Sequence, residues 1–208
     1  MKAAHLLAVA ATATACSTAG TGALAPPTPN ERSSLQALRA LVRGPSATSD
    51  IFADGNAHAV AIAVMRQLSS PAIPEVDIYR WERSSWHSAA TIALDVGGSV
   101  AADGGATTPI RTADITPATT PELVVTVHYN AGPAAAILST YGGHWHALGF
   151  HGGLAEDGDE RSDVAVRPGG IVTSTENDCV PNCADGHQVT TAYRFSTASG
   201  RLEATTSQ

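Results

Sequence analysis

Three histidines near residue 150 are the densest group of side chains that could bind a metal ion: His144, His146 and His151. On an extended strand His144 and His146 share a face, and Trp145 lies on the other face. If Trp145 points into the core, both imidazoles face solvent and could bind zinc or copper with a third ligand. His151 has the wrong parity unless a glycine bend redirects it. We favour the alternative, that these are exposed polar residues on the outer face of a strand.

The acidic run 156–163 is the second group of possible metal ligands. Asp157, Asp159 and Asp163 have the spacing of the first, third and seventh positions of a calcium loop. Arg161 occupies the fifth position, however, and no glycine stands at the sixth. The run therefore favours a solvated acidic loop over a calcium site.

Catalytic motifs are absent from the sequence. It contains no G-x-S-x-G, S-x-x-K or H-E-x-x-H pattern. Paired carboxylates for glycoside hydrolysis come together only in three dimensions, and nothing in the sequence selects such a pair. We therefore expect a non-enzymatic protein without a cofactor. The alternative is a hydrolase that uses some of Asp114, Glu122, His128, His144 and His146 in one deep cleft.

Two of the three cysteines, Cys179 and Cys183, flank a proline-containing turn and are close enough to pair. In an oxidising compartment we expect a disulfide, which would stiffen this short loop locally. A redox role is the alternative, but the C-x3-C spacing differs from the C-x-x-C of redox enzymes. The surrounding segment, 177–186, resembles the ends of many secreted proteins of actinobacteria.

The third cysteine, Cys16, ends an apolar leader. Residues 1–15 have a charged start at Lys2, an apolar stretch and then small residues, as secretory signals do. The apolar stretch is shorter than the roughly 20 residues that cross a bilayer. Small residues before a cysteine resemble the lipobox of bacterial lipoproteins, although Ala13 stands where that family prefers Leu, Val or Ile. The resemblance implies that Cys16 is lipidated and becomes the N-terminus. Ordinary cleavage near Ala15, which would leave a secreted protein, and a cytosolic protein are the alternatives.

The charge of the chain disfavours polyanionic partners. The net charge is −7, and the only lysine, Lys2, lies in the leader. Such a chain is a poor candidate for binding nucleic acid or anionic lipid by electrostatic attraction. The length suits one domain and a tether.

A helix is expected after the leader and a disordered tether at 16–28. Thr28 is placed to be the N-cap, Pro29 fits the first turn and Glu31 completes a capping box. The pattern predicts an amphipathic helix over 29–43 that packs on the main domain through an apolar stripe. The stripe consists of Leu35, Leu38, Leu41 and Val42.

The remainder, 49–208, is predicted to be a single domain, mainly β. Alternating and β-branched runs separated by turn residues indicate antiparallel hairpins. The strands expected are 76–81, 86–94, 123–129, 134–140, 144–150, 188–195 and 201–205.

Three of these hairpins share a layout, in which a large side chain opens the returning strand. That side chain is Trp86 in the first copy, Trp145 in the second and Leu202 in the third. We expect each copy to bury this side chain against its neighbours.

The segment 113–125 resembles an FG-GAP or VCBS-type repeat, typically A-D-V-N/T-G-D-G-x-P-E/D-L-V-V. In that family the Gly-Asp-Gly turn contributes to a calcium loop. Here Asp114 and Glu122 are retained, but Pro117-Ala118-Thr119 replaces the turn and Ala118 removes its carboxylate. The resemblance implies a strand–turn–strand frame without its calcium site. The family builds propellers from many blades; three units predict a smaller open assembly, either propeller-blade-like or sandwich-like.

Together these features predict a lipoprotein on the extracytoplasmic face of the cell membrane. Its lipid would contact the membrane, and its β domain would bind an envelope ligand or protein or serve a structural role. An envelope hydrolase and a metal-binding surface protein are the alternatives.

Overall fold

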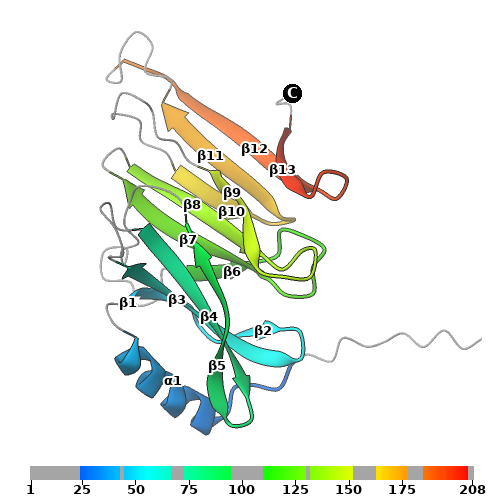
Figure 1. Ribbon diagram of the computed structural model, residues 1–208. Coiled ribbons are helices and arrows are strands. Elements are labelled where there is room, and N and C mark those ends of the chain that lie inside the picture. Colours follow the sequence, from blue (N-terminus) through cyan, green and yellow to red (C-terminus); the bar gives the residue numbers. More distant parts are fainter. Residues whose placement is uncertain are drawn as a thin grey trace, which may run out of the picture.

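The computed structural model describes residues 24–42, 45–66, 73–94, 110–129, 132–151, 163–177 and 185–205. Within these ranges the protein is mainly β, with three open antiparallel sheets and one N-terminal helix (Figure 1). This confirms the predicted fold class. No helix in the described ranges is long and apolar enough to span a bilayer.

Several sequence predictions fall outside the described ranges and stay predictions. They concern the leader with Cys16, the acidic residues Asp157 and Asp159, and the Cys179–Cys183 disulfide.

The helix, α1 (Pro29–Leu41), begins as its sequence predicts. Thr28 Oγ1 accepts a hydrogen bond from Glu31 N at 3.3 Å, and the Glu31 carboxylate accepts one from Thr28 N. The predicted stripe is only partly right. Leu35 is buried, but Leu41 is 78% exposed. The helix ends at Leu41, and Val42 already has an extended backbone, so the predicted apolar stripe is not helical over its full length.

The first sheet contains five strands. These are β1 (Pro45–Thr48), β2 (Phe52–Asp54), β3 (Ala57–Arg66), β4 (Ile73–Glu82) and β5 (Ser85–Ala93). Their order is β1-β3-β4-β5, and β2 also pairs with β3. The first strand of this sheet thus begins at Pro45. The stretch from Ala59 to Val64 is buried at every residue. Because both faces of β3 are covered, its sequence shows no polar alternation.

The second and third sheets each contain four strands that follow one another in chain order. The second consists of β6 (Ile110–Ala113), β7 (Glu122–Tyr129), β8 (Gly132–Ser139) and β9 (His146–His151). The third consists of β10 (Asp163–Arg167), β11 (Ile171–Asn177), β12 (Gln188–Ser196) and β13 (Arg201–Thr205).

The predicted hairpin repeat is present as the last two strands of each sheet: β4–β5, β8–β9 and β12–β13. Each side chain that opens the last strand contacts the preceding layer. The Trp86 indole donates to the Glu31 carbonyl of α1 at 3.3 Å. Trp145 packs with the core between the first two sheets, and Leu202 packs with the core between the last two. Helix α1 therefore covers the first sheet in the way that each sheet covers the next one in the stack.

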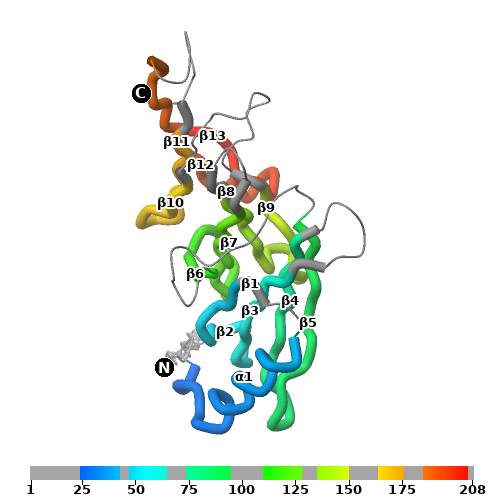
Figure 2. Tube along the Cα trace, turned by 90° about the vertical axis from the view of Figure 1, so that its left-hand side faces the viewer, coloured from blue at the N-terminus to red at the C-terminus, as the bar shows by residue number. Residues whose placement is uncertain are grey.

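The layers are stacked in chain order, from α1 at one end to the third sheet at the other (Figures 1 and 2). One apolar core joins the first and second sheets, and a smaller one joins the second and third. On the third sheet, Tyr193 and Phe195 pack into the smaller core. Thr175 and Thr190 pair across the strands at 2.9 Å on the other face. A polar outer face allows a stack of sheets to end without a further layer.

Candidate functional site

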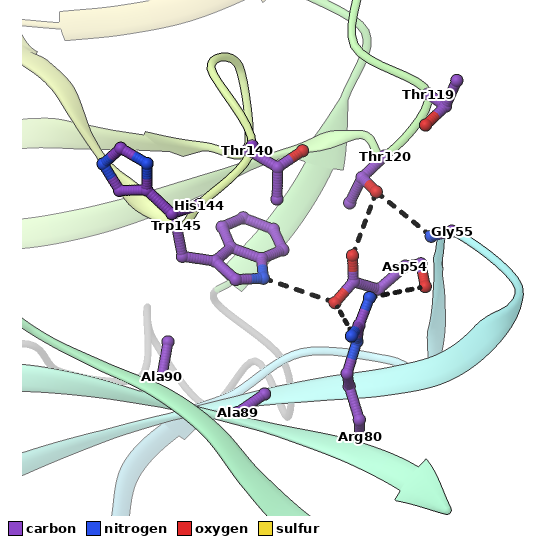
Figure 3. A pocket seen from close by; sticks show the side chains of 11 residues that line it. Asp54, Gly55, Arg80, Ala89, Ala90, Thr119, Thr120, Thr140, His144 and Trp145 are labelled. Atoms are coloured by element: carbon purple, nitrogen blue, oxygen red, sulfur yellow. Dashed lines mark hydrogen bonds and ion pairs between the residues drawn. The ribbon is translucent and has the colours of Figure 1, made fainter.

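Asp54, at the end of β2, is the centre of a hydrogen-bond network between the first two sheets (Figure 3). The residue is only 3% exposed. Its Oδ2 accepts from Arg80 Nε at 2.7 Å and from Trp145 Nε1 at 3.3 Å. Its Oδ1 accepts from Thr120 Oγ1 at 3.0 Å, and Thr120 Oγ1 accepts in turn from Gly55 N at 3.2 Å. The buried carboxylate is therefore paired with a cation and hydrogen-bonded to both sheets.

Local turns place these side chains. Gly55 has a φ of 62°, which lets the chain reverse between β2 and β3 directly after Asp54. Gly142 and Gly143 have φ values of 90° and 95° in the turn that precedes Trp145. The Trp145 ring then meets Phe52 edge to face, with the ring centroids 6.1 Å apart.

An open groove of about 490 Å³ lies beside this network. Its lining includes Arg80 from β4 and Ala89 and Ala90 from β5. Thr140, His144 and Trp145 line it from the turn between β8 and β9, as Figure 3 shows. In the part of the chain that the structure describes, the groove thus combines the Arg80 cation, the Trp145 indole and a short apolar floor.

Arg80 is oriented by Asp54 but still faces the groove. Its Nε donates to the Asp54 carboxylate, and its Nη2 donates to the Asp54 carbonyl oxygen at 3.3 Å. The side chain is nevertheless 39% exposed. Among the described residues, its remaining guanidinium donors have no protein partner. They form a cationic edge whose orientation is already set.

The segment that resembles an FG-GAP or VCBS repeat runs from the end of β6 to β7. Glu122 is 1% exposed and receives four hydrogen bonds. The donors are Ile115 N (2.7 Å), Thr116 N (3.1 Å), Thr116 Oγ1 (2.5 Å) and Ser139 Oγ (2.9 Å). Asp114 is exposed. Glu122 therefore organises the loop through protein donors, which occupy the lone pairs that a cation would need.

The predicted histidine pair forms, on either side of an inward-pointing Trp145. The rings of His144 and His146 lie 5.2 Å apart and are tilted by 38°. His146 Nδ1 lies 3.0 Å from the His144 carbonyl oxygen. Within the described ranges no group of three metal-binding side chains occurs. For His151 the structure describes the backbone alone.

The hydrolase candidates do not converge on the groove. Of the five, His144 lines it. The Glu122 carboxylate accepts hydrogen bonds from the β6–β7 loop, and for His128 the structure describes the backbone alone. The residues that do converge, Asp54 and Arg80, were missed in the sequence. The Asp54-Gly55 pair between two apolar runs is a hairpin signal that could have located one of them.

A second polar cluster joins α1 to β3. His58 Nδ1 lies 2.5 Å from Glu31 Oε1, and His58 Nε2 lies 2.8 Å from the Ala25 carbonyl oxygen. Burial raises the pKa of Glu31, but the hydrogen bonds from His58 and Thr28 and the charge of His58 together outweigh it. The net effect lowers the pKa below its ordinary value. This cluster fastens the helix and has no adjoining cation site among the described residues.

No protein-family model, curated protein or solved structure matches the chain.

Proposed function

We propose that this protein is a lipid-anchored, non-enzymatic binding module on the extracytoplasmic face of a bacterial cell membrane. Its ligand occupies the groove between the first two sheets. The observation that carries the proposal is the partly exposed guanidinium of Arg80, held in place by the buried Asp54. A preoriented charged group beside an open groove lowers the cost of ordering on binding.

The same geometry argues against hydrolysis in this groove. A general acid or base must reach the reacting proton, and a glycosidase uses two carboxyl groups on either side of the bond. The carboxylate that lines the groove, Asp54, accepts hydrogen bonds from Arg80, Trp145 and Thr120. A carboxylate committed in this way is poorly placed to exchange a proton with a substrate.

The location half of the proposal rests on the leader and on Cys16. Acyl chains contribute about 0.8 kcal/mol for each buried methylene, so several chains on Cys16 would hold the protein at a membrane. Mass spectrometry of the membrane fraction is expected to find a lipidated N-terminal peptide that begins at Cys16. The Cys16→Ser variant should leave that fraction. An unmodified peptide beginning at Thr14 or Ser17 would refute the anchor.

The binding half is tested by sedimentation of the Cys16→Ser protein with isolated cell envelopes. Ala89 lies in the groove and is exposed, so Ala89→Trp fills the groove without disturbing a core. Its matched control is Ala204→Trp, at an exposed position of β13. We expect Ala204→Trp to sediment like the parent protein and Ala89→Trp to stay in the supernatant. Equal sedimentation of the two variants would place binding elsewhere.

A further inference from the structure

We infer that the groove binds a sugar that carries a carboxylate, and that Arg80 binds that carboxylate. This rests on the proposed function and names its ligand class. Three features of the groove favour such a ligand: the unused edge of the Arg80 guanidinium, the surface beside it, and the net charge of the site.

The unused edge of Arg80 suits a planar oxyanion. Asp54 takes Nε and one hydrogen of Nη2, so the outer edge of the guanidinium faces the groove. Two parallel N–H groups at fixed spacing match the two oxygens of a carboxylate. Because Asp54 already sets the side-chain conformation, little further rotamer entropy is lost when a ligand binds.

The surface beside Arg80 suits a sugar ring. The indole N–H of Trp145 is used by Asp54, while its ring lines the groove near Ala89 and Ala90. Apolar surfaces of this kind pack against the C–H faces of a ring. Thr140 and His144 supply polar groups at the opposite rim for hydroxyls (Figure 3). The volume of about 490 Å³ is in the range of small-ligand pockets.

The charge balance favours a single carboxylate over a phosphate chain. Among the described residues that line the groove, Arg80 is the one arginine, and Asp54 neutralises part of its charge. The whole chain carries a net charge of −7, so it gives no long-range attraction to densely charged anions and can hold a carboxylate only by short-range contact with Arg80. One bidentate contact is therefore what the site can offer.

The test is a titration of the ¹⁵N-labelled Cys16→Ser protein at low salt with digalacturonic acid. The matched ligand is its methyl ester, which keeps the rings and removes the charge. We expect the acid to shift the Arg80, Ala89 and Trp145 resonances, and the ester to bind at least about tenfold more weakly. Equal binding of acid and ester would overturn the carboxylate and leave the binding module intact. No shift with either ligand would overturn the sugar class, and envelope sedimentation would then decide the function separately.

A charge placed in the groove gives a second test that leaves Arg80 and Asp54 untouched. Ala89→Glu adds a carboxylate, and Ala89→Gln adds the same bulk without charge. We expect the acid to bind Ala89→Glu at least about tenfold more weakly than Ala89→Gln. Equal affinities would overturn the role of charge. Competition of digalacturonic acid with envelope sedimentation indicates an envelope glycan with widely spaced carboxylates as the source. Binding of the acid without envelope sedimentation indicates a free acid sugar.

Discussion

Nδ1 of His58 in β3 lies 2.5 Å from Oε1 of Glu31 in the first turn of α1. The other ring nitrogen, Nε2, lies 2.8 Å from the Ala25 carbonyl oxygen, so each ring nitrogen has an oxygen within hydrogen-bond distance. Glu31 also caps the helix and accepts from Trp86 through its carbonyl. The helix is thus attached through a polar cluster as much as through Leu35.

Replacing Glu31 by Gln should destabilise the protein at neutral pH. The variant loses a buried carboxylate, which pairs with His58 and accepts a hydrogen bond from Thr28. We expect a loss of about 1–3 kcal/mol in the free energy of unfolding, measured with urea at pH 7. Gln36→Ala, at an exposed position of the same helix, is the control and should change stability little.

The same variant gives a pH dependence of defined sign. The pKa of Glu31 is lowered on folding from its ordinary value of 4.5, so its charged form contributes stability above that value. The contribution is lost as the pH falls through the lowered folded pKa. The stability difference between the parent protein and Glu31→Gln should therefore shrink below pH 4.5. A difference that stays constant down to pH 2 would show that the charge of Glu31 contributes nothing.

Asp54 should be the most sensitive polar position between the first two sheets. Asp54→Ala removes the acceptors for Arg80, Thr120 and Trp145 together. We expect a loss of about 2–4 kcal/mol, since several donors lose their partner at once. Trp145→Phe removes one of these bonds and some packing volume. In a double-mutant cycle by urea unfolding, the two changes should be less than additive. Strict additivity would mean that the bond contributes no coupling.

Glu122 is expected to act through hydrogen bonds and not through calcium. Glu122→Gln replaces an acceptor that faces Ile115 N, Thr116 and Ser139 with a group that also donates. The melting temperature should fall, by an amount equivalent to roughly 2–3 kcal/mol. Chelation by EDTA or addition of calcium should leave the melting temperature of the parent protein unchanged. A calcium-dependent increase that Glu122→Gln abolishes would restore a metal role.

Gly170 is expected to be required for the contact between the second and third sheets. A Cβ there would lie 2.9 Å from the Asp114 carbonyl oxygen and 3.0 Å from that of Ile115, and φ is 70°. Gly169 has a similar φ of 79° but open space around it. By thermal unfolding, Gly169→Ala should cost about 1 kcal/mol from its backbone alone. Gly170→Ala should cost clearly more, and equal costs would mean that the neighbouring loop simply moves away.

Features that depend on neighbours in the sequence were predicted well. The capping box of Thr28 and Glu31 located the start of α1 because its hydrogen bonds join residues three apart. The hairpins β4–β5, β8–β9 and β12–β13 were predicted because short turns and alternating strands are local patterns. The bounds of strand β3 were not predicted from the sequence, since a strand that is buried on both faces lacks the alternation of polar and apolar residues. The prediction that Leu41 packs on the domain was wrong, because the spacing of apolar residues does not show where a helix leaves the surface on which it packs.

By itself, then, the sequence determined the mainly β class, the helix start, the hairpin repeat and the expectation of an exported, lipid-anchored chain. The tertiary structure alone decided the groove. Asp54, Arg80 and Trp145 come from β2, β4 and the turn before β9, and they meet only when the first two sheets stack. That stacking is driven by apolar burial, which is non-directional and spread over many residues. No short motif in the sequence can therefore record which polar side chains it brings together.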